Sequence, residues 1–247
     1  MSTVATTPSP EPAPGLSTVA RITNVFFSPS TTFTDLKRKP SWWAAWLLIS
    51  VFSLLFVFAI QQKVGFDQVF ENQMRSNPKS AEQLDKMTAD QKAVAEKITA
   101  GVSYSTPIIL LIISLIFAGI YLATFNFGLG TEVSFGLSLA IVFYAGIPQI
   151  LQSVLGAISL YAGADPEAFN PNNPVATNLG YFVSQSNHPA LFTLGSFVDI
   201  FRIWTVILTG IGFACVSKVK RSTAISVTAG WYVLIALIFS GIAFVRS

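Results

Sequence analysis

Residues 42–60 read WWAAWLLISVFSLLFVFAI, an apolar run without a single charged side chain. An α-helix rises about 1.5 Å per residue, so about 20 apolar residues cross a hydrocarbon core about 30 Å thick. The run opens with tryptophans at 42, 43 and 46, and indole rings favour the membrane–water interface. This stretch therefore predicts an integral membrane protein.

The composition of the whole chain agrees with a membrane location. The 247 residues are 52% hydrophobic and 11% charged, whereas soluble domains carry about 25% charged residues. Because the charges gather in a few segments, long apolar stretches remain between them. We predict an all-α integral membrane protein with five transmembrane helices, within the apolar runs 42–60, 106–127, 137–161, 197–216 and 225–245.

The fourth run differs from the others because it contains Asp199 and Arg202. An ionised side chain at a helix centre costs about 2.5–3.5 kcal/mol on the insertion scale and less near an end, so the run still counts as a span. The three-residue spacing places both charges on one side of a helix. We expect them to face the bundle interior or the outer interface, either as a structural ion pair or as an outward-facing polar pocket for a lipid headgroup or small solute.

Basic residues near the span ends predict the orientation. Residues 37–39 are all basic and precede the first run, while Lys218, Lys220 and Arg221 lie between the last two runs. Both segments should be cytoplasmic. Five spans then place the C-terminus, with Arg246, outside.

The segment 61–103 is predicted to be a polar helical insert on the outer side. It carries six basic residues, but these are spread over a segment that has the pattern of a folded unit. Ser80 with Gln83 and Thr88 with Gln91 have the spacing of capping boxes. Two short amphipathic helices are expected, with one apolar face packed on the rest of the protein: Leu84, Met87, Val94 and Ile98.

Before the first span we expect a tail and a surface helix. Residues 1–21 are rich in Pro, Ser and Thr, lack the apolar core of a signal peptide, and are predicted to be a disordered cytoplasmic tail ahead of a membrane domain at 22–245. Residues 28–37 offer an N-cap and the apolar side chains Phe33 and Leu36. They predict a short amphipathic helix on the inner leaflet, either as an anchor for the first span or as a docking point for a partner.

The residues needed for catalysis are scarce in this chain. It has one histidine, His188, and one cysteine, Cys215, and it lacks both the G-x-S-x-G elbow and the phosphate-binding loop. We predict no enzymatic activity, no metal site and no cofactor. The basic residues lie where topology requires them, so no nucleic-acid partner is expected.

Two features of the spans invite structural or functional interpretations. Gln149 and Gln152 follow Pro148, which should kink the third span; such glutamines join helices or line a solute path. Small residues flank the last loop. Counted outward from Lys220, they predict that spans four and five pack closely, with Gly210 facing Gly230 and Ala214 facing Ser226.

Three short motifs occur in order along this frame: Pro29-x-x-x-Phe33, Tyr144-x-x-x-Pro148 and Asp199-x-Phe201-x-x-Trp204, the last followed by Gly210 and Gly212. Together they resemble the Yip domain, a family of Ypt/Rab-interacting membrane proteins and their bacterial relatives. The resemblance covers residues 22–245. It implies a five-helix membrane domain with a cytoplasmic N-terminus and no known catalytic activity.

Eukaryotic members of that family are linked to vesicle traffic and to Rab-class GTPases. This chain departs from them in its polar insert at 61–103 and in its short N-terminal tail, so GTPase binding is not carried over. The insert resembles the bacterial branch, which implies a location in the bacterial cytoplasmic membrane.

The sequence supports two functions of different classes. The first is a non-enzymatic membrane protein that organises membrane or recruits a membrane or cytoplasmic protein partner. The alternative is a carrier or channel for a small solute or lipid. A continuous polar path through the bundle would favour the alternative, and a packed interior with surface grooves only would favour the first.

Overall fold

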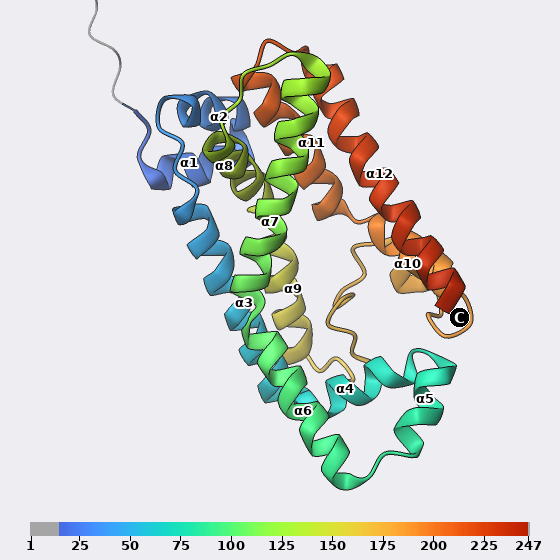
Figure 1. Ribbon diagram of the computed structural model, residues 1–247. Coiled ribbons are helices and arrows are strands. Elements are labelled where there is room, and N and C mark those ends of the chain that lie inside the picture. Colours follow the sequence, from blue (N-terminus) through green and yellow to red (C-terminus); the bar gives the residue numbers. More distant parts are fainter. Residues whose placement is uncertain (1–14, 247) are drawn as a thin grey trace, which may run out of the picture.

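The computed structural model describes residues 15–246, which fold into helices joined by short turns and one long loop (Figure 1). In this part of the chain, pairing of the β type is limited to one isolated bridge between Asn178 and Asp199. Four helical stretches are long and apolar enough to cross a membrane, which confirms four of the five predicted spans. They are α3 (Trp43–Lys63), α7 (Thr106–Ala123) with its π-helical extension η1 (Thr124–Gly128), α8 (Phe135–Gly146) with α9 (Gln149–Tyr161), and α12 (Arg221–Arg246).

The predicted fourth span is a broken helix. α10 (Pro189–Phe197) and α11 (Ile200–Val216) are separated by Val198 and Asp199, and both pack along α12. With 17 residues, α11 alone extends about 26 Å, which is short of a hydrocarbon core about 30 Å thick. The single continuous helix predicted for 197–216 is therefore wrong, and apolar α10 supplies additional length along α12.

The break between α8 and α9 lies at Ile147 and Pro148, where the predicted kink is found. Proline has no N–H for the helical ladder, and its ring displaces the preceding turn. The two halves nevertheless follow one path through the bundle (Figure 1). α8 supplies much of the central core, whereas α9 packs mainly against α3.

The insert after α3 contains three helices, α4 (Phe66–Arg75), α5 (Pro78–Asp85) and α6 (Ala89–Tyr104), where two were predicted. The capping box of Thr88 and Gln91 is confirmed, but Asn77 caps α5 in place of Ser80. Leu84 is fully buried, whereas Val94 and Ile98 are 57% and 61% exposed. The predicted common apolar face is therefore wrong for α6.

At the opposite end of the molecule from α4 and α5, α1 (Thr18–Phe27) and α2 (Pro29–Arg38) form a helical hairpin (Figure 1). Phe33 and Leu36 are fully buried in the central core, and α2 packs on α11 and α8. The apolar side of α2 therefore faces protein, and not the inner leaflet as predicted.

The predicted boundary of the N-terminal tail also needs correction. α1 begins at Thr18 and Arg21 is buried, so residues 18–21 belong to the folded domain. The first 14 residues of the predicted tail lie outside the described part of the chain.

α11 and α12 form an antiparallel hairpin, as predicted, but the predicted register is wrong. A methyl group built on Gly210 would lie 2.6 Å from the Cα of Ile225, whereas Gly230 has open space around it. Ser226 is likewise exposed and does not face Ala214. The reason lies in the turn: α11 ends at Val216, so the axis of the hairpin lies near residue 218 and not at Lys220.

The core between the helices is aromatic. Phe125 and Phe213 stack with their ring centroids 4.2 Å apart, joining η1 to α11. Indole N–H groups tie further spans together: Trp46 Nε1 donates to the Pro107 carbonyl at 3.1 Å, and Trp231 Nε1 donates to Thr124 Oγ1 at 3.0 Å. The spans are thus held by close packing and side-chain hydrogen bonds, the forces available between helices in lipid.

Candidate functional site

Asp199, the first residue of the third sequence motif, is fully buried at the break between α10 and α11. Its Oδ1 accepts the backbone N–H groups of Phe201 at 2.9 Å and Arg202 at 3.0 Å, which makes it the N-cap of α11. Its Oδ2 accepts from Thr177 Oγ1 at 2.5 Å and from Gln152 Nε2 at 3.1 Å. Four donors and the positive end of a helix offset the cost of burying this carboxylate.

The predicted structural pair of Asp199 and Arg202 is wrong. Within residues 15–246 no ion pair joins Arg202 to a carboxylate, because both oxygens of Asp199 are turned toward the helix terminus and the loop. The Arg202 guanidinium lies over the ring of Phe197, with its Cζ 5.7 Å from the ring centroid. Only Asp199 is fully buried; Arg202 is half-buried.

The two glutamines of α9 both reach α11 or its cap. Gln149 Nε2 donates to Thr205 Oγ1 at 3.0 Å, and Gln152 Nε2 donates to Asp199 as described above. The Thr205 hydroxyl in turn donates a hydrogen bond to the Phe201 carbonyl at 3.0 Å. These contacts fit the interpretation that the glutamines join helices.

The same cluster anchors the long loop between α9 and α10. Asn178 pairs with Asp199 across the isolated bridge, and its Nδ2 donates to Asn173 Oδ1 at 2.6 Å. The 3-10 turn η3 (Leu179–Phe182) then packs on α10 so closely that a methyl group on Gly195 would lie 2.7 Å from the Gly180 nitrogen. Asp199 thus fixes the loop as well as the helix.

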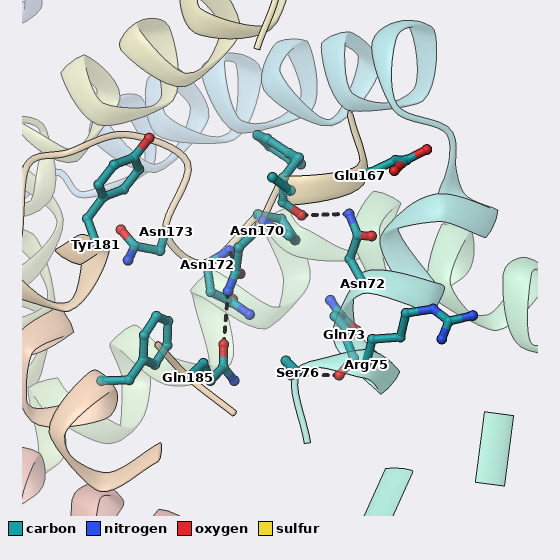
Figure 2. A pocket seen from close by; sticks show the side chains of 14 residues that line it. Asn72, Gln73, Arg75, Ser76, Glu167, Asn170, Asn172, Asn173, Tyr181 and Gln185 are labelled. Carbon is teal, nitrogen blue, oxygen red and sulfur yellow. Dashed lines mark hydrogen bonds between the residues drawn. The ribbon is translucent and has the colours of Figure 1, made fainter. Parts of the chain in front are cut away.

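Residues 167–173 of this loop, together with Tyr181 and Gln185, form one wall of a polar hollow of about 530 Å³. α4 forms the opposite wall (Figure 2). Asn72 Nδ2 donates to the carbonyls of Pro166, in the 3-10 turn η2 (Pro166–Ala168), at 2.8 Å and of Phe169 at 2.9 Å. Figure 2 also shows the bond from Asn170 Nδ2 to Gln185 Oε1, at 3.1 Å. The polar residues that line the hollow are Asn72, Gln73, Arg75, Ser76, Glu167, Asn170, Asn172, Asn173, Tyr181 and Gln185.

Amide side chains carry both donors and acceptors, so this hollow is suited to a neutral polar ligand or to polar atoms of a partner. It holds one cation, Arg75, and one anion, Glu167, among its lining residues. In the described residues no group of three His, Cys, Asp or Glu side chains could hold a metal ion. The sequence offered one signal for the hollow, the asparagines at 170, 172 and 173 between prolines.

A second polar cluster lies at the α1–α2 hairpin. Arg21 Nε and Asp35 Oδ2 form an ion pair at 2.6 Å, with both side chains 8% exposed. Arg21 also donates to the Lys39 carbonyl at 3.2 Å, and its own carbonyl accepts from Thr32 Oγ1 at 2.8 Å. Sequence analysis missed this pair.

Burial raises the pKa of Asp35, but a hydrogen bond from the Leu16 N–H, the bond from Arg21 and the charges of Arg21 and Arg38 lower it more. The pKa of this carboxyl therefore lies below its ordinary value, and the ion pair is formed at neutral pH.

The remaining motif residues gather where the hairpin meets the bundle. Pro29 opens α2, and the Phe33 ring lies against Gly212, where a methyl group would be 3.1 Å from it. Tyr144 is fully buried in the same core. Trp204 meets Phe26 of α1 edge to face, with ring centroids 5.7 Å apart.

Most residues of the three motifs therefore lie in two places: where the hairpin packs on α8 and α11, and at the capped break before α11. A family model described as the Yip1 domain matches residues 23–242. Neither the curated proteins nor the solved structures contain a match to the chain. Since the match spans nearly the whole sequence, the protein belongs to the Yip1 domain family of membrane proteins.

Proposed function

We propose that this protein is a non-enzymatic multi-pass membrane protein with a trafficking-like role, in which it organises membrane or recruits partner proteins. The observation that supports this most is the separation of its two polar clusters. One contains Arg21 and Asp35, the other contains Asp199 with the polar hollow, and the aromatic core lies between them.

The core contains few polar groups; the buried hydroxyls of Ser50, Tyr144 and Ser240 have no hydrogen-bond partner among the described residues, and three others are bonded to backbone. Ser138 Oγ donates to the Ala118 carbonyl at 2.8 Å, Thr209 Oγ1 to the Thr205 carbonyl at 2.8 Å, and Thr228 Oγ1 to the Val206 carbonyl at 3.1 Å. Hydroxyls engaged in this way offer no chain of sites for a solute. This favours a packed scaffold over a carrier or channel.

Recruitment is supported by the surface around the hairpin. The Arg221 guanidinium donates to Ser30 Oγ at 2.8 Å, which ties the α11–α12 turn to α2. In the same hairpin α1 exposes the large apolar side chains Phe27 by 83% and Val19 by 73%, and the basic residues 37–39 lie at the end of α2. We place this surface in the cytoplasm, at the inner face of a bacterial cytoplasmic membrane.

Reconstitution in liposomes tests the choice between scaffold and carrier. Purified protein should produce no flux of fluorescent phospholipid or of trapped small solutes above that of empty liposomes. Saturable flux that scales with the amount of protein would contradict the scaffold proposal and favour the carrier.

Photo-crosslinking in native membranes tests recruitment. A photoreactive residue at position 27 should give discrete protein adducts, because Phe27 projects from the hairpin. The control position is 55, where Leu55 is 56% exposed on the span α3 and should react with lipid. Identical adduct patterns at 27 and 55 would argue against a partner at the hairpin.

A further inference from the structure

An apolar groove of about 330 Å³ runs between α10, α11 and α12. Its walls include Ile203, Val233 and Leu237, which are 41%, 54% and 56% exposed, so the groove opens on the surface that faces lipid. It extends along α12 from Ile225 to Leu237, a rise of about 18 Å. The length and the apolar lining of the groove suit a lipid acyl chain.

A cation, Arg202, lies beside one wall of this groove. Phe197 and Tyr232 both line it, with ring centroids 5.5 Å apart, and the Tyr232 hydroxyl donates to the Phe197 carbonyl at 2.5 Å. Arg202 lies over the Phe197 ring, which in turn packs against the Tyr232 ring. The guanidinium therefore lies beside the groove, over the Phe197 ring that forms part of its wall.

Among residues 15–246, no carboxylate forms an ion pair with Arg202. The nearby carboxylate, Asp199, already accepts four hydrogen bonds, two of them from the N-terminus of α11. Arg202 lies opposite Tyr232, which is 11 residues, or about 17 Å, from the start of α12. An arginine at such a depth on a lipid-facing surface is costly unless an anion reaches it, and headgroups are drawn inward to such residues.

We propose that the groove binds one phospholipid with an anionic headgroup, its acyl chain between α10 and α12 and its phosphate on Arg202. Guanidinium groups bind phosphate through paired, charge-assisted hydrogen bonds, and this charge complementarity selects the lipid over an uncharged occupant. Drawing a headgroup to this depth thins the bilayer locally. The inference extends the proposed organising function to a lipid, and it would stand if no protein partner existed.

Native mass spectrometry of the full-length protein tests the proposal, with dioleoyl phosphatidylglycerol compared with dioleoyl phosphatidylcholine. Arg202→Gln should retain one phosphatidylglycerol fewer per chain and bind that lipid about tenfold more weakly, as for loss of a hydrogen bond to a charged group. Arg202→Lys keeps the charge but loses the paired hydrogen bonds, so its preference for phosphatidylglycerol should lie between those of the parent and Arg202→Gln. Arg75→Gln, which removes a cation from the polar hollow, should bind as the parent does.

A second variant blocks the groove itself. Ala229 lines it, and Ala229→Phe should reduce retention of both lipids while Arg202 is unchanged. Melting temperatures in the same detergent identify variants that fail to fold. The lipid retention of the variants that do fold then tests the proposal. Unchanged phosphatidylglycerol retention in folded Arg202→Gln, equal loss in Arg202→Lys, or full retention in Ala229→Phe would overturn the proposal. Lipid retention and liposome flux are separate measurements, so either proposal can fail alone.

Discussion

Two buried aspartates, Asp35 and Asp199, have different structural roles in this protein. Asp35 neutralises Arg21 and holds the α1–α2 hairpin together, whereas Asp199 caps a helix and fixes a loop without any ionic partner. Both are in the interior, where a carboxylate is stable only when its oxygens are satisfied. The difference between them predicts different responses to substitution.

For Asp35 we predict a stability loss that depends on pH. Asp35→Asn leaves Arg21 buried without its counter-charge and should cost about 3 kcal/mol at pH 7, the lower end of the range for breaking a buried pair. The folded-state pKa of Asp35 is lowered, so its contribution is complete above the ordinary carboxyl pKa of about 3.9 and is lost as pH falls through the folded value.

Melting curves in detergent between pH 7 and pH 3 check this prediction. The gap between parent and Asp35→Asn should narrow below about pH 4. Asp85→Asn, at an exposed aspartate of α5, is the control and should change stability by less than about 0.5 kcal/mol. A gap that stays constant down to pH 3 would mean that the carboxylate of Asp35 does not titrate with folding.

For Asp199 we predict independence from Arg202. In a double-mutant cycle of Asp199→Asn and Arg202→Gln, the two changes in unfolding free energy should add to within about 0.5 kcal/mol, because no ion pair links the side chains. Asp199→Asn alone should lower stability by about 1–3 kcal/mol, because the amide oxygen can still cap α11 but the amide N–H2 group cannot accept from Thr177 and Gln152. A coupling energy well above 1 kcal/mol would restore the ion pair that the sequence suggested.

The sequence identified Asp199 correctly as an unusual residue but not its function. Three-residue spacing brings two side chains to one face of a continuous helix, and the helix is not continuous here because Asp199 precedes its first turn. The ion pair of Arg21 with Asp35 could not be predicted from the sequence for another reason. The two residues are 14 positions apart, and only the folding of one helix against another brings them together.

At the scale of elements, the close approach of α11 and α12 depends on one glycine. Gly210 lies against the backbone of Ile225, and Gly230 lies on the open side of α12. The sequence predicted a glycine contact between these helices, yet a hairpin's register depends on where the helices end. An error of two residues in the centre of a turn shifts the expected partner by about four, one full helical turn.

A matched pair of substitutions tests this packing. Gly210→Ala places a methyl group 2.6 Å from a backbone atom and should cost about 1–3 kcal/mol through overpacking. Gly230→Ala meets nothing and should be neutral or stabilise the helix by up to about 1 kcal/mol. Thermal unfolding in detergent measures both. Equal effects from the two alanines would contradict the register described above.

Local sequence signals predicted those features that depend on the residues of a single helix. Four spans, the kink at Pro148 and the cap at Thr88 follow from apolar length, a missing N–H and a side-chain acceptor. The α1–α2 hairpin could not be predicted from local signals, because its apolar face is equally suited to contact with lipid and with protein. The polar hollow also depends on two segments about 100 residues apart, Asn72 and the loop at 166–173.

At the scale of the whole molecule, the two halves of the broken helix explain how a short α11 belongs to a membrane domain. α10 and α11 both pack along α12, and Asp199 at the break between them is fully buried with both carboxylate oxygens hydrogen-bonded, which satisfies polar groups that a bilayer would leave without partners. We therefore expect α10 and α11 to form one discontinuous span. On this expectation the chain crosses the membrane five times, with the hairpin cytoplasmic and the polar hollow outside.

Cysteine accessibility tests this topology most directly. In a Cys215→Ser background, single cysteines are placed by Lys220→Cys in the α11–α12 turn, Gln185→Cys in the polar hollow and Val245→Cys near the end of α12. A membrane-impermeant maleimide should label positions 185 and 245 in intact cells, and position 220 only after permeabilisation. Labelling of positions 220 and 245 from the same side would show that α12 does not cross the membrane, and labelling of 185 and 220 from the same side would show that α10 and α11 do not.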